Sequence, residues 1–289
     1  MPEGDTVFIT ARRLREALVE RTITRFDLRV PQLALADRTG ESVVDVAPIG
    51  KHLMIRFSGG TSLHSHLRMD GAWRVGPASE RPRGRDFEIR ALIGNAEQLA
   101  SGIRVHDLAL VPTDRESELV GHLGPDLLAA DFDLAEAVAR AGAQPSRPIG
   151  EVLLDQRIVA GIGNVYKCEL LFLHRLDPWQ DTASVPDLPA VLLDAVRLLK
   201  ANLGNYNRST TGWNQPGQQY YVYGRPGRGC RRCGTAIRQA EQGDPSEERV
   251  LYYCPSCQHV AEPPPEATAD RRLRAGSAAN RRPARPRRL

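Results

Sequence analysis

The sequence predicts an α+β protein of several domains: an N-terminal β-sandwich led by one helix, then a helical domain, then a small cysteine-rich ribbon. Three observations support this order. Short strand-like segments follow one amphipathic segment up to about residue 112, helical spacing dominates residues 131–203, and two C-x2-C pairs lie near the end. A chain of 289 residues has room for about two domains of common size.

The first part of the chain begins with a helix and continues as strands. Residues 6–19 carry apolar side chains at helical spacing, at Val7, Ala11, Leu14 and Leu18. The strand-like segments are residues 22–30, 42–48, 52–67, 71–76, 86–94 and 102–111. The pair Gly59–Gly60 predicts a two-residue hairpin turn inside the third of these segments. Antiparallel strands in this number form a sandwich or a barrel.

Helical spacing continues through the middle of the chain, in residues 133–141, 149–156, 165–174 and 188–203. Gly161 and Gly163 interrupt the pattern, and Asn164 stands where the third helix would begin, as its predicted N-cap. Because unpaired amides at a helix start attract anions, this stretch is suited to hold a nucleic-acid phosphate. A structural helical hairpin without a ligand is the alternative.

We predict five segments: residues 1–115 as the β-sandwich domain, 116–130 as a linker, 131–219 as the helical domain, 220–261 as the ribbon and 262–289 as a disordered basic tail. Residues 270–289 hold eight arginines and one aspartate, too little apolar surface for a core. The rest of the chain, with 31 basic and 34 acidic residues, has a net charge of −3. Residues 195–240 are basic without any acidic residue, which favours phosphate binding.

Four of the five cysteines form two C-x2-C pairs, Cys230 with Cys233 and Cys254 with Cys257, separated by twenty residues. Two such knuckles close a tetrahedron of thiolates around one structural Zn²⁺ ion. The fifth, Cys168, lies in a helical segment and is not an expected ligand. The cysteine pattern does not suggest a set of disulfides, which favours a reducing cytoplasm. The first residues also lack the apolar core of a secretory signal peptide. No apolar run approaches a membrane span.

The chain opens with Met-Pro-Glu-Gly, and a proline directly behind the initiator methionine needs an explanation. A small second residue permits removal of the methionine, so we expect Pro2 to be the mature N-terminus. Its secondary amine would then be a nucleophile carried on a rigid ring. The alternative is an ordinary start for the helix that follows.

Six motifs occur in a fixed order: PEG at 2–4, GKHLM at 50–54, SHLRMDGAWRV at 65–75, GPD at 124–126, LLDQRIVAGIGNVY at 153–166 and YYCPSCQ at 252–258. With this combination the chain resembles the Fpg/Nei DNA glycosylases, in particular the endonuclease VIII (Nei) branch. The resemblance implies a β-sandwich, a helix-two-turn-helix DNA-binding domain with a zinc hairpin, and damaged DNA bound between the lobes. It also implies a bifunctional DNA glycosylase/AP lyase of base excision repair.

The resemblance assigns catalytic roles to four residues. Pro2 would attack the sugar C1′ and form a Schiff base, and Glu3 would move protons as the sugar ring opens. Lys51 would contact phosphate and donate a proton during β-elimination. Arg249 would grip phosphates around the lesion and serve δ-elimination; because arginine is almost never deprotonated, we expect its role to be electrostatic.

Five further residues are expected at the DNA. Asn164 and His66 match phosphate contacts of the family. The loop around Arg68 and Met69 matches the intercalating loop, with Met69 as an apolar wedge into the gap left by an everted base. The alternative for Met69 is a core side chain. His122 falls where the endonuclease VIII pattern has an arginine, so its contact with DNA stays open.

The sequence also departs from the family. Asp5 and Thr6 stand where a proline and a second glutamate are common, and residues 103–110 replace the Arg–Phe loop of the 8-oxoguanine branch. This disfavours 8-oxoguanine opposite cytosine and leaves oxidised pyrimidines, abasic sites or single-stranded lesions. The expected partner is damaged DNA, duplex or single-stranded. We expect the protein to act as a monomer and not to associate with a membrane.

Two rival functions stay open: an AP lyase with little glycosylase activity, and a non-catalytic damaged-DNA-binding zinc protein. Intact Pro2, Glu3 and Lys51 argue against the second. Small tautomerases also use an N-terminal proline, as a general base, but they have neither a zinc ribbon nor an extended helical domain.

Overall fold

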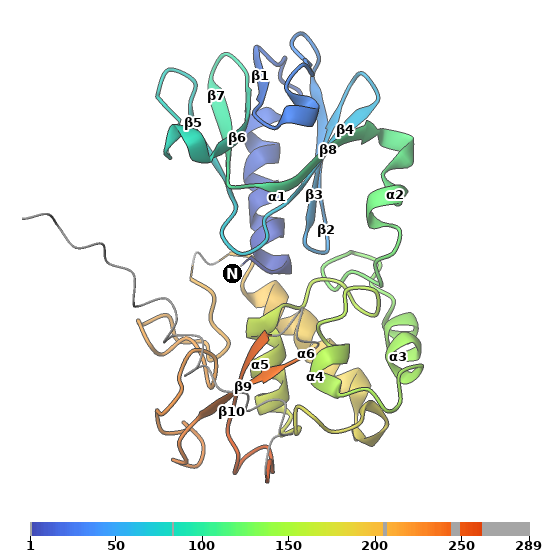
Figure 1. Cartoon of the computed structure of the whole chain (residues 1–289), viewed down its shortest axis with the longest axis vertical. Helices are drawn as coiled ribbons and strands as arrows, with labels where there is room; N and C mark the ends of the chain where they lie inside the picture. The colour runs from blue at the N-terminus through green and yellow to red at the C-terminus, as the bar shows by residue number, and fades with distance from the viewer. Residues whose placement is uncertain (1, 83, 205–206, 244–248, 262–289) are drawn as a thin grey trace, which may run out of the picture.

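The computed structural model describes residues 2–82, 84–204, 207–243 and 249–261. These form two lobes, with the N-terminus at their junction (Figure 1). The predicted basic tail, residues 262–289, lies outside the described residues. None of the helices within the described ranges is both long and apolar enough to span a bilayer.

Helix α1, Gly4–Leu18, runs along the first lobe and supplies part of its core. The predicted apolar face is confirmed, because four of its side chains are at most 1% exposed: Val7, Ala11, Leu14 and Leu18. Glu3 is the N-cap residue of this helix, which places the carboxylate at the junction between the lobes.

Eight antiparallel strands form the rest of this lobe as two four-stranded sheets, so the predicted β-sandwich is confirmed. One sheet has the order β1-β6-β7-β5 and the other β2-β3-β4-β8. Their apolar faces share one core with α1. The strands are β1 Arg25–Leu28, β2 Val43–Ile49, β3 His52–Phe57, β4 Thr61–His66, β5 Ala72–Pro77, β6 Ile89–Gly94, β7 Gln98–Ile103 and β8 His106–Pro112. Short 3₁₀ turns lie between them at Pro31–Leu33 and Asp86–Glu88, and a third follows β8 at Thr113–Arg115.

The turn between β3 and β4 differs from the prediction of two residues. Arg56 pairs with Ser62, and residues 58–60 connect the two strands. Gly60 has a φ of +74°, the left-handed conformation that a glycine adopts without a steric penalty at the end of a three-residue hairpin loop. The connection is therefore one residue longer than the Gly-Gly pair suggested.

The second lobe is helical, and the segment predicted as a linker contains a short helix of its own, α2 Ser117–Val120. The other helices are α3 Leu134–Gly142, α4 Ile149–Val152, α5 Asn164–Leu173 and α6 Leu188–Ala201, with a 3₁₀ turn at Thr182–Ser184. The helix predicted over 149–156 ends after one turn. The Asp155 carboxylate accepts from the backbone N–H of Arg157 at 3.0 Å, a local bond that competes with helix continuation.

The predicted ribbon contains a two-stranded hairpin, β9 Arg238–Gln242 and β10 Arg249–Tyr253, with Arg249 paired to Gln242. This hairpin packs on α5, and the two share the core of the second lobe. Cys168 is buried on α5 away from the four paired cysteines, as predicted for a helix residue. The hairpin and the start of α5 thus lie next to each other at the junction.

Candidate active site and metal centre

The lobes meet where the PEG motif at the start of the chain touches the GIG motif before α5. The amide of Gly4 donates to the carbonyl of Gly161 at 3.0 Å. A Cβ on Gly4 would lie 3.0 Å from the Gly161 backbone, and one on Gly163 would lie 2.4 Å from the carboxyl carbon of Glu3. These glycines are therefore needed because the two backbones approach so closely.

Glu3 fills the anion site at the start of α5. Its carboxylate is fully buried and accepts from the amides of Gly163 at 3.0 Å, Val165 at 2.7 Å and Tyr166 at 3.3 Å. The first amides of a helix have no partner within the helix and carry its positive dipole end. The anion site predicted here exists, but this chain's own carboxylate occupies it.

Asn164 is not the N-cap that the sequence suggested, because Gly163 holds that position. The side-chain amide of Asn164 donates to the Val250 carbonyl at 2.7 Å and so ties α5 to β10. An amide group has two N–H donors, so one is left for a ligand. Its oxygen is buried and has no hydrogen-bond partner within the described ranges.

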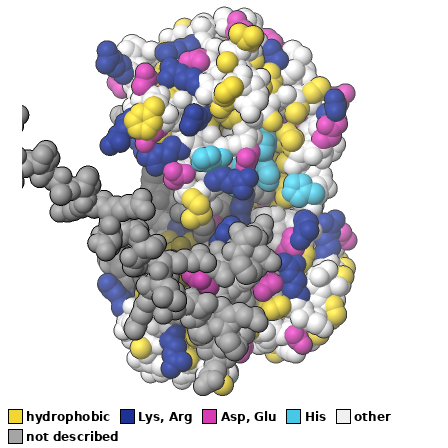
Figure 2. All heavy atoms as spheres, in the orientation of Figure 1, with side chains coloured by type: hydrophobic (Ala, Val, Ile, Leu, Met, Phe, Trp, Pro, Cys, Tyr) yellow, Lys and Arg dark blue, Asp and Glu magenta, His cyan; other side chains and the backbone are white. Residues whose placement is uncertain are grey.

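A cleft of about 370 Å³ opens at the junction and brings seven predicted residues together. They are Pro2, Lys51, His66, Arg68, Met69, Asn164 and Arg249. Glu3, the eighth, is fully buried and does not line the cleft. His122 lines a neighbouring cleft of about 470 Å³ that Arg249 also borders. Figure 2 shows histidine, lysine and arginine side chains gathered along the waist between the lobes.

Lys51 enters this cleft from the turn between β2 and β3. Burial lowers the pKa of its ammonium to about 8, opposed by the negative charge of Glu3 and assisted by the positive charges of Arg249 and Arg208. A lysine with such a pKa exchanges a proton near neutral pH far more readily than an exposed one.

His66 is a neutral hydrogen-bond donor in this cleft. Burial lowers its pKa to about 4, with a further contribution from the positive charge of Arg68. The amide of Arg68 donates to His66 Nδ1 at 2.9 Å, so the proton of the neutral ring lies on Nε2. His66 can thus offer an N–H to a phosphate without carrying a charge.

Two histidines that the sequence analysis missed stand behind His66. His52 Nδ1 and His64 Nε2 are 2.8 Å apart, and His64 Nδ1 is 3.0 Å from the carbonyl oxygen of Asp107. Because a carbonyl only accepts, His64 donates to Asp107 and His52 donates to His64. Burial also lowers the pKa of His52 to about 3. The available signal was the alternation of His64 and His66 on one face of a strand.

The loop between β4 and β5 presents Met69 to solvent, with 64% of its surface exposed. Met69 is therefore not the core side chain of the alternative reading. Arg68 next to it has a φ of +50°, and its guanidinium lies 2.6 Å from the carboxylate of Asp107. The apolar side chain of Met69 thus projects from the loop, while the charge of the neighbouring Arg68 is paired with Asp107.

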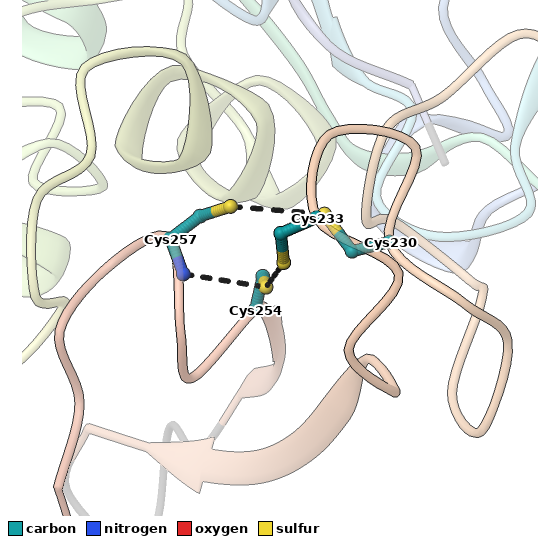
Figure 3. A group of neighbouring side chains, drawn as sticks. All are labelled: Cys230, Cys233, Cys254 and Cys257. Carbon is teal, nitrogen blue, oxygen red and sulfur yellow. Dashed lines mark hydrogen bonds between the residues drawn. The ribbon is translucent and has the colours of Figure 1, made fainter.

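The candidate metal centre is formed by the four cysteines of the two C-x2-C motifs (Figure 3). Their sulfur atoms all lie within 4.8 Å of one another, with Cys230–Cys257 at 3.9 Å and Cys233–Cys254 at 3.5 Å. A tetrahedral ion with bonds of about 2.3 Å to sulfur requires sulfur–sulfur distances of roughly 3.8 Å. The donor set and its spacing therefore fit one closed, four-coordinate metal ion.

The contact between Gly163 and Glu3 predicts a stability effect. Gly163→Ala should lower the free energy of unfolding by about 1–3 kcal/mol, because the new methyl group overlaps a carboxylate that is held by three amides. Urea unfolding measures this. Gly142→Ala is the matched control, since its Cβ would meet nothing within 4 Å. Equal unfolding midpoints for the two variants would contradict the packing described here.

Comparison with known proteins places the chain in a family. Residues 1–103 match the model of the formamidopyrimidine-DNA glycosylase N-terminal domain, and residues 123–210 match that of the formamidopyrimidine-DNA glycosylase H2TH domain. A Streptomyces coelicolor protein named "Probable endonuclease 8 2" is 49% identical, over 92% of this chain and 96% of the relative. A Mycolicibacterium smegmatis protein named DNA-(apurinic or apyrimidinic site) lyase Nei2 is 44% identical, over 89% and 99%.

Comparison with solved structures indicates the same family. The structure of Lactococcus lactis formamidopyrimidine-DNA glycosylase bound to DNA with an abasic site is similar, with a TM-score of 0.73 and 25% identity. The likeness covers 89% of this chain and 99% of that one. With its two domain matches and its endonuclease 8 relatives, the chain belongs to the Fpg/Nei family of DNA glycosylases and AP lyases, in the endonuclease VIII (Nei) branch.

Proposed function

We propose that this protein is a bifunctional DNA glycosylase/AP lyase of base excision repair whose nucleophile is the Pro2 amine. The observation that carries the proposal is the cleft itself. Pro2 shares it with Lys51, Asn164 and Arg249, and the buried carboxylate of Glu3 is the next residue. The start of α1 adds a positive dipole end that disfavours a protonated amine beside it.

In the first step, the nitrogen of Pro2 forms a bond to the sugar C1′ while the bond from C1′ to the base breaks. The base leaves with the electron pair and is protonated. The Pro2 nitrogen then gives up its own proton, and its lone pair opens the C1′–O4′ bond while O4′ takes a proton, so that an iminium links the sugar to Pro2. A secondary amine suits this step because its imine is positively charged without a further proton. Glu3 is proposed to handle the protons of ring opening.

The iminium makes the C2′ hydrogen acidic, and its removal expels the 3′ phosphate by β-elimination. Loss of the C4′ hydrogen then expels the 5′ phosphate by δ-elimination. Lys51 would contact phosphate and donate a proton in the first elimination. Arg249, at the start of β10, would hold the phosphates around the lesion and stabilise the second through its charge.

The remaining cleft residues would hold the DNA. Met69 would fill the gap left by the everted base, and Arg68 would exchange its ion pair with Asp107 for contacts to the exposed bases. His66 and Asn164 would donate to phosphates. His122 lies beside the neighbouring cleft, where a longer stretch of DNA backbone would pass.

The metal centre is proposed to hold one structural Zn²⁺. Four thiolates close the coordination sphere, so no open position is left for a catalytic water. The ion would keep the β9–β10 hairpin rigid, and with it Arg249 at the cleft.

For the substrate, we propose oxidised pyrimidines and abasic sites, in duplex or single-stranded DNA, processed by a monomer. The segment of residues 103–110, which runs from the end of β7 into β8, supports a preference other than 8-oxoguanine, because it lacks the Arg–Phe loop of that branch. An AP lyase with little glycosylase activity is the second candidate. It is favoured by the relative whose name specifies that lyase activity alone.

The function is tested by trapping the intermediate. Borohydride reduction should fix the enzyme to an oxidised-pyrimidine duplex, and mass spectrometry should locate the sugar remnant on Pro2. Protein trapped on abasic DNA but not on base lesions would favour the second candidate. A remnant on a lysine, or an active protein that keeps Met1, would contradict the proposal.

The lowered pKa of Lys51 predicts a pH dependence of strand cleavage. An ammonium with a pKa of about 8 is protonated below that value and loses its proton above it. The kcat/KM for cleavage at a preformed abasic site should therefore fall as the pH rises through about 8. Lys51→Arg should be slower but should not show this fall, since arginine keeps its proton. The same fall in the variant would exclude Lys51 as its source.

The exposed wedge predicts a dependence on DNA form. Met69→Ala should reduce base removal from duplex DNA by roughly tenfold or more and leave single strands nearly unaffected, since only a duplex leaves a stacked gap. Single-turnover rates on matched lesions measure this. Leu35→Ala, at a fully exposed apolar side chain outside the cleft, is the control and should change neither rate. Equal losses on both DNA forms would remove the wedge role.

The metal centre predicts a linked loss of zinc and DNA affinity. Cys233→Ser should lower both, whereas Cys168→Ala should retain the metal.

Arg249→Ala should retain zinc, weaken binding to all sequences and reduce the log–log salt slope by about 0.9, as for one lost phosphate contact. Zinc analysis and binding at several salt concentrations check this. An unchanged slope would mean that Arg249 does not contact phosphate.

A further inference from the structure

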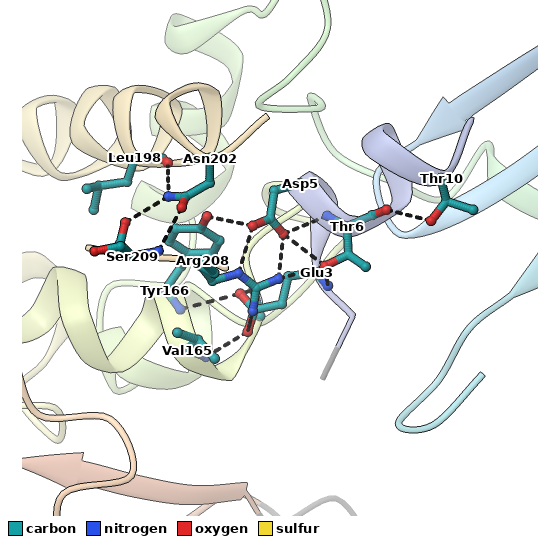
Figure 4. Close-up of polar contacts among 11 residues, drawn as sticks. Glu3, Asp5, Thr6, Thr10, Val165, Tyr166, Leu198, Asn202, Arg208 and Ser209 are labelled. Atoms are coloured by element: carbon teal, nitrogen blue, oxygen red, sulfur yellow. Dashed lines mark hydrogen bonds and ion pairs between the residues drawn. The ribbon is translucent and has the colours of Figure 1, made fainter. Parts of the chain in front are cut away.

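A buried charge cluster centred on Arg208 lies against Glu3 (Figure 4). The Arg208 side chain is 11% exposed and that of Asp5 is 4% exposed. Two guanidinium nitrogens donate to the two Asp5 oxygens, Nε at 2.7 Å and Nη2 at 2.5 Å. The third, Nη1, is 3.6 Å from Oε1 of Glu3. One guanidinium thus faces two buried carboxylates.

Neighbouring groups fix the orientation of this guanidinium. The Tyr166 hydroxyl donates to Asp5 Oδ2 at 2.8 Å, and the guanidinium carbon lies 5.1 Å from the centre of the Tyr166 ring. Arg208 Nη2 also donates to Thr6 Oγ1 at 2.8 Å. The same hydroxyl accepts from the Glu3 amide at 3.4 Å. Asp5 and Thr6, which depart from the family pattern, therefore both contact Arg208.

The backbone that carries Arg208 is itself held by two helices. The next residue, Ser209, exchanges two hydrogen bonds with the side chain of Asn202 at the end of α6, at 2.7 and 2.9 Å. Glu169 on α5 accepts from Thr210 and from three successive amides, of Tyr221, Val222 and Tyr223. The described part of the loop that carries Arg208 is thus tied to α5 and α6, and such ties are what precise placement of a charge requires.

We propose that Arg208 is a positioning residue for Glu3, oriented by Asp5, so that the loop after α6 sets the place of the catalytic carboxylate. The proposal rests on the proposed role of Glu3, which moves the protons when the sugar ring opens in the base-removal reaction. The carboxylate's two oxygens have separate anchors: Oε2 accepts from the Gly163 and Tyr166 amides, and Oε1 accepts from Val165 and faces Arg208.

Charge balance supports this assignment. Without the guanidinium, Glu3 and Asp5 would be two buried negative charges in one site, which is strongly unfavourable. Burial opposes the charge of Arg208, but the carboxylates of Glu3 and Asp5 outweigh it and raise its pKa above the ordinary value. A lysine could replace the charge but not the fork that reaches both carboxylates at once.

The test compares two reactions of the full-length protein. Arg208→Lys should slow removal of an oxidised pyrimidine from duplex DNA by roughly tenfold to a hundredfold, the range for a displaced acid–base group. Cleavage of a preformed abasic site should change less than about threefold, because that substrate needs no base removal. Arg115→Lys, which breaks an exposed two-bond pair with Glu118, is the control and should change neither rate.

A double-mutant cycle separates positioning from general support. In a Glu3→Gln background, Arg208→Lys should cause no further loss of base removal, because the two side chains act as one unit. Asp5→Asn is the second variant if Arg208→Lys does not fold, and it should show the same selective loss. Additive losses, or equal losses on both substrates in a folded variant, would overturn the proposal. Normal base removal by Glu3→Gln would instead refute the proposed role of Glu3.

Discussion

The contact on which this structure depends is the insertion of one carboxylate, Glu3, into the start of α5. That bond network joins the second residue of the proposed mature chain to a helix more than 160 residues away. It works because a helix start offers unpaired amides and a positive dipole end, while a carboxylate offers two oxygens to accept from them. Pro2 is therefore placed by the residue that follows it.

The junction between the lobes is polar, whereas each lobe has an apolar core of its own. Gly4 bonds to Gly161, and the Gly50 amide donates to the carboxylate of Asp126 at 2.7 Å. Buried polar contacts add little net stability, but they allow few alternative arrangements. The site needs the defined geometry more than the free energy, because its proposed groups come from the residues just before α1, from the β2–β3 turn and from β10.

The sequence predicted the architecture well because periodicity and spacing report burial directly. The apolar face of α1 and the two C-x2-C knuckles depend on residues close together in the chain, and both lie where they were expected. The start of α5 was also recognised as an anion site. What fills it was not, because no local pattern shows that Glu3 reaches it across the fold.

The groups missed by sequence analysis share one property: their partners are distant in the chain. Arg208 stands in a loop rich in glycine, asparagine and threonine, where composition gives no sign of burial. Its partner Asp5 was noticed only as a departure from the family pattern. His52 and His64 came together through strand pairing, which sequence periodicity alone does not register.

The division between local and distant contacts bears on how this site could vary among related chains. The residues proposed to react lie on short motifs, but the charge that balances Glu3 comes from Arg208 and is matched by Asp5. A change at either one alone leaves a buried charge without its counterpart, whereas a paired change can restore the balance. We therefore infer that positions 5 and 208 are constrained together. That constraint ties the loop after α6, which borders the junction, to the chemistry at the N-terminus.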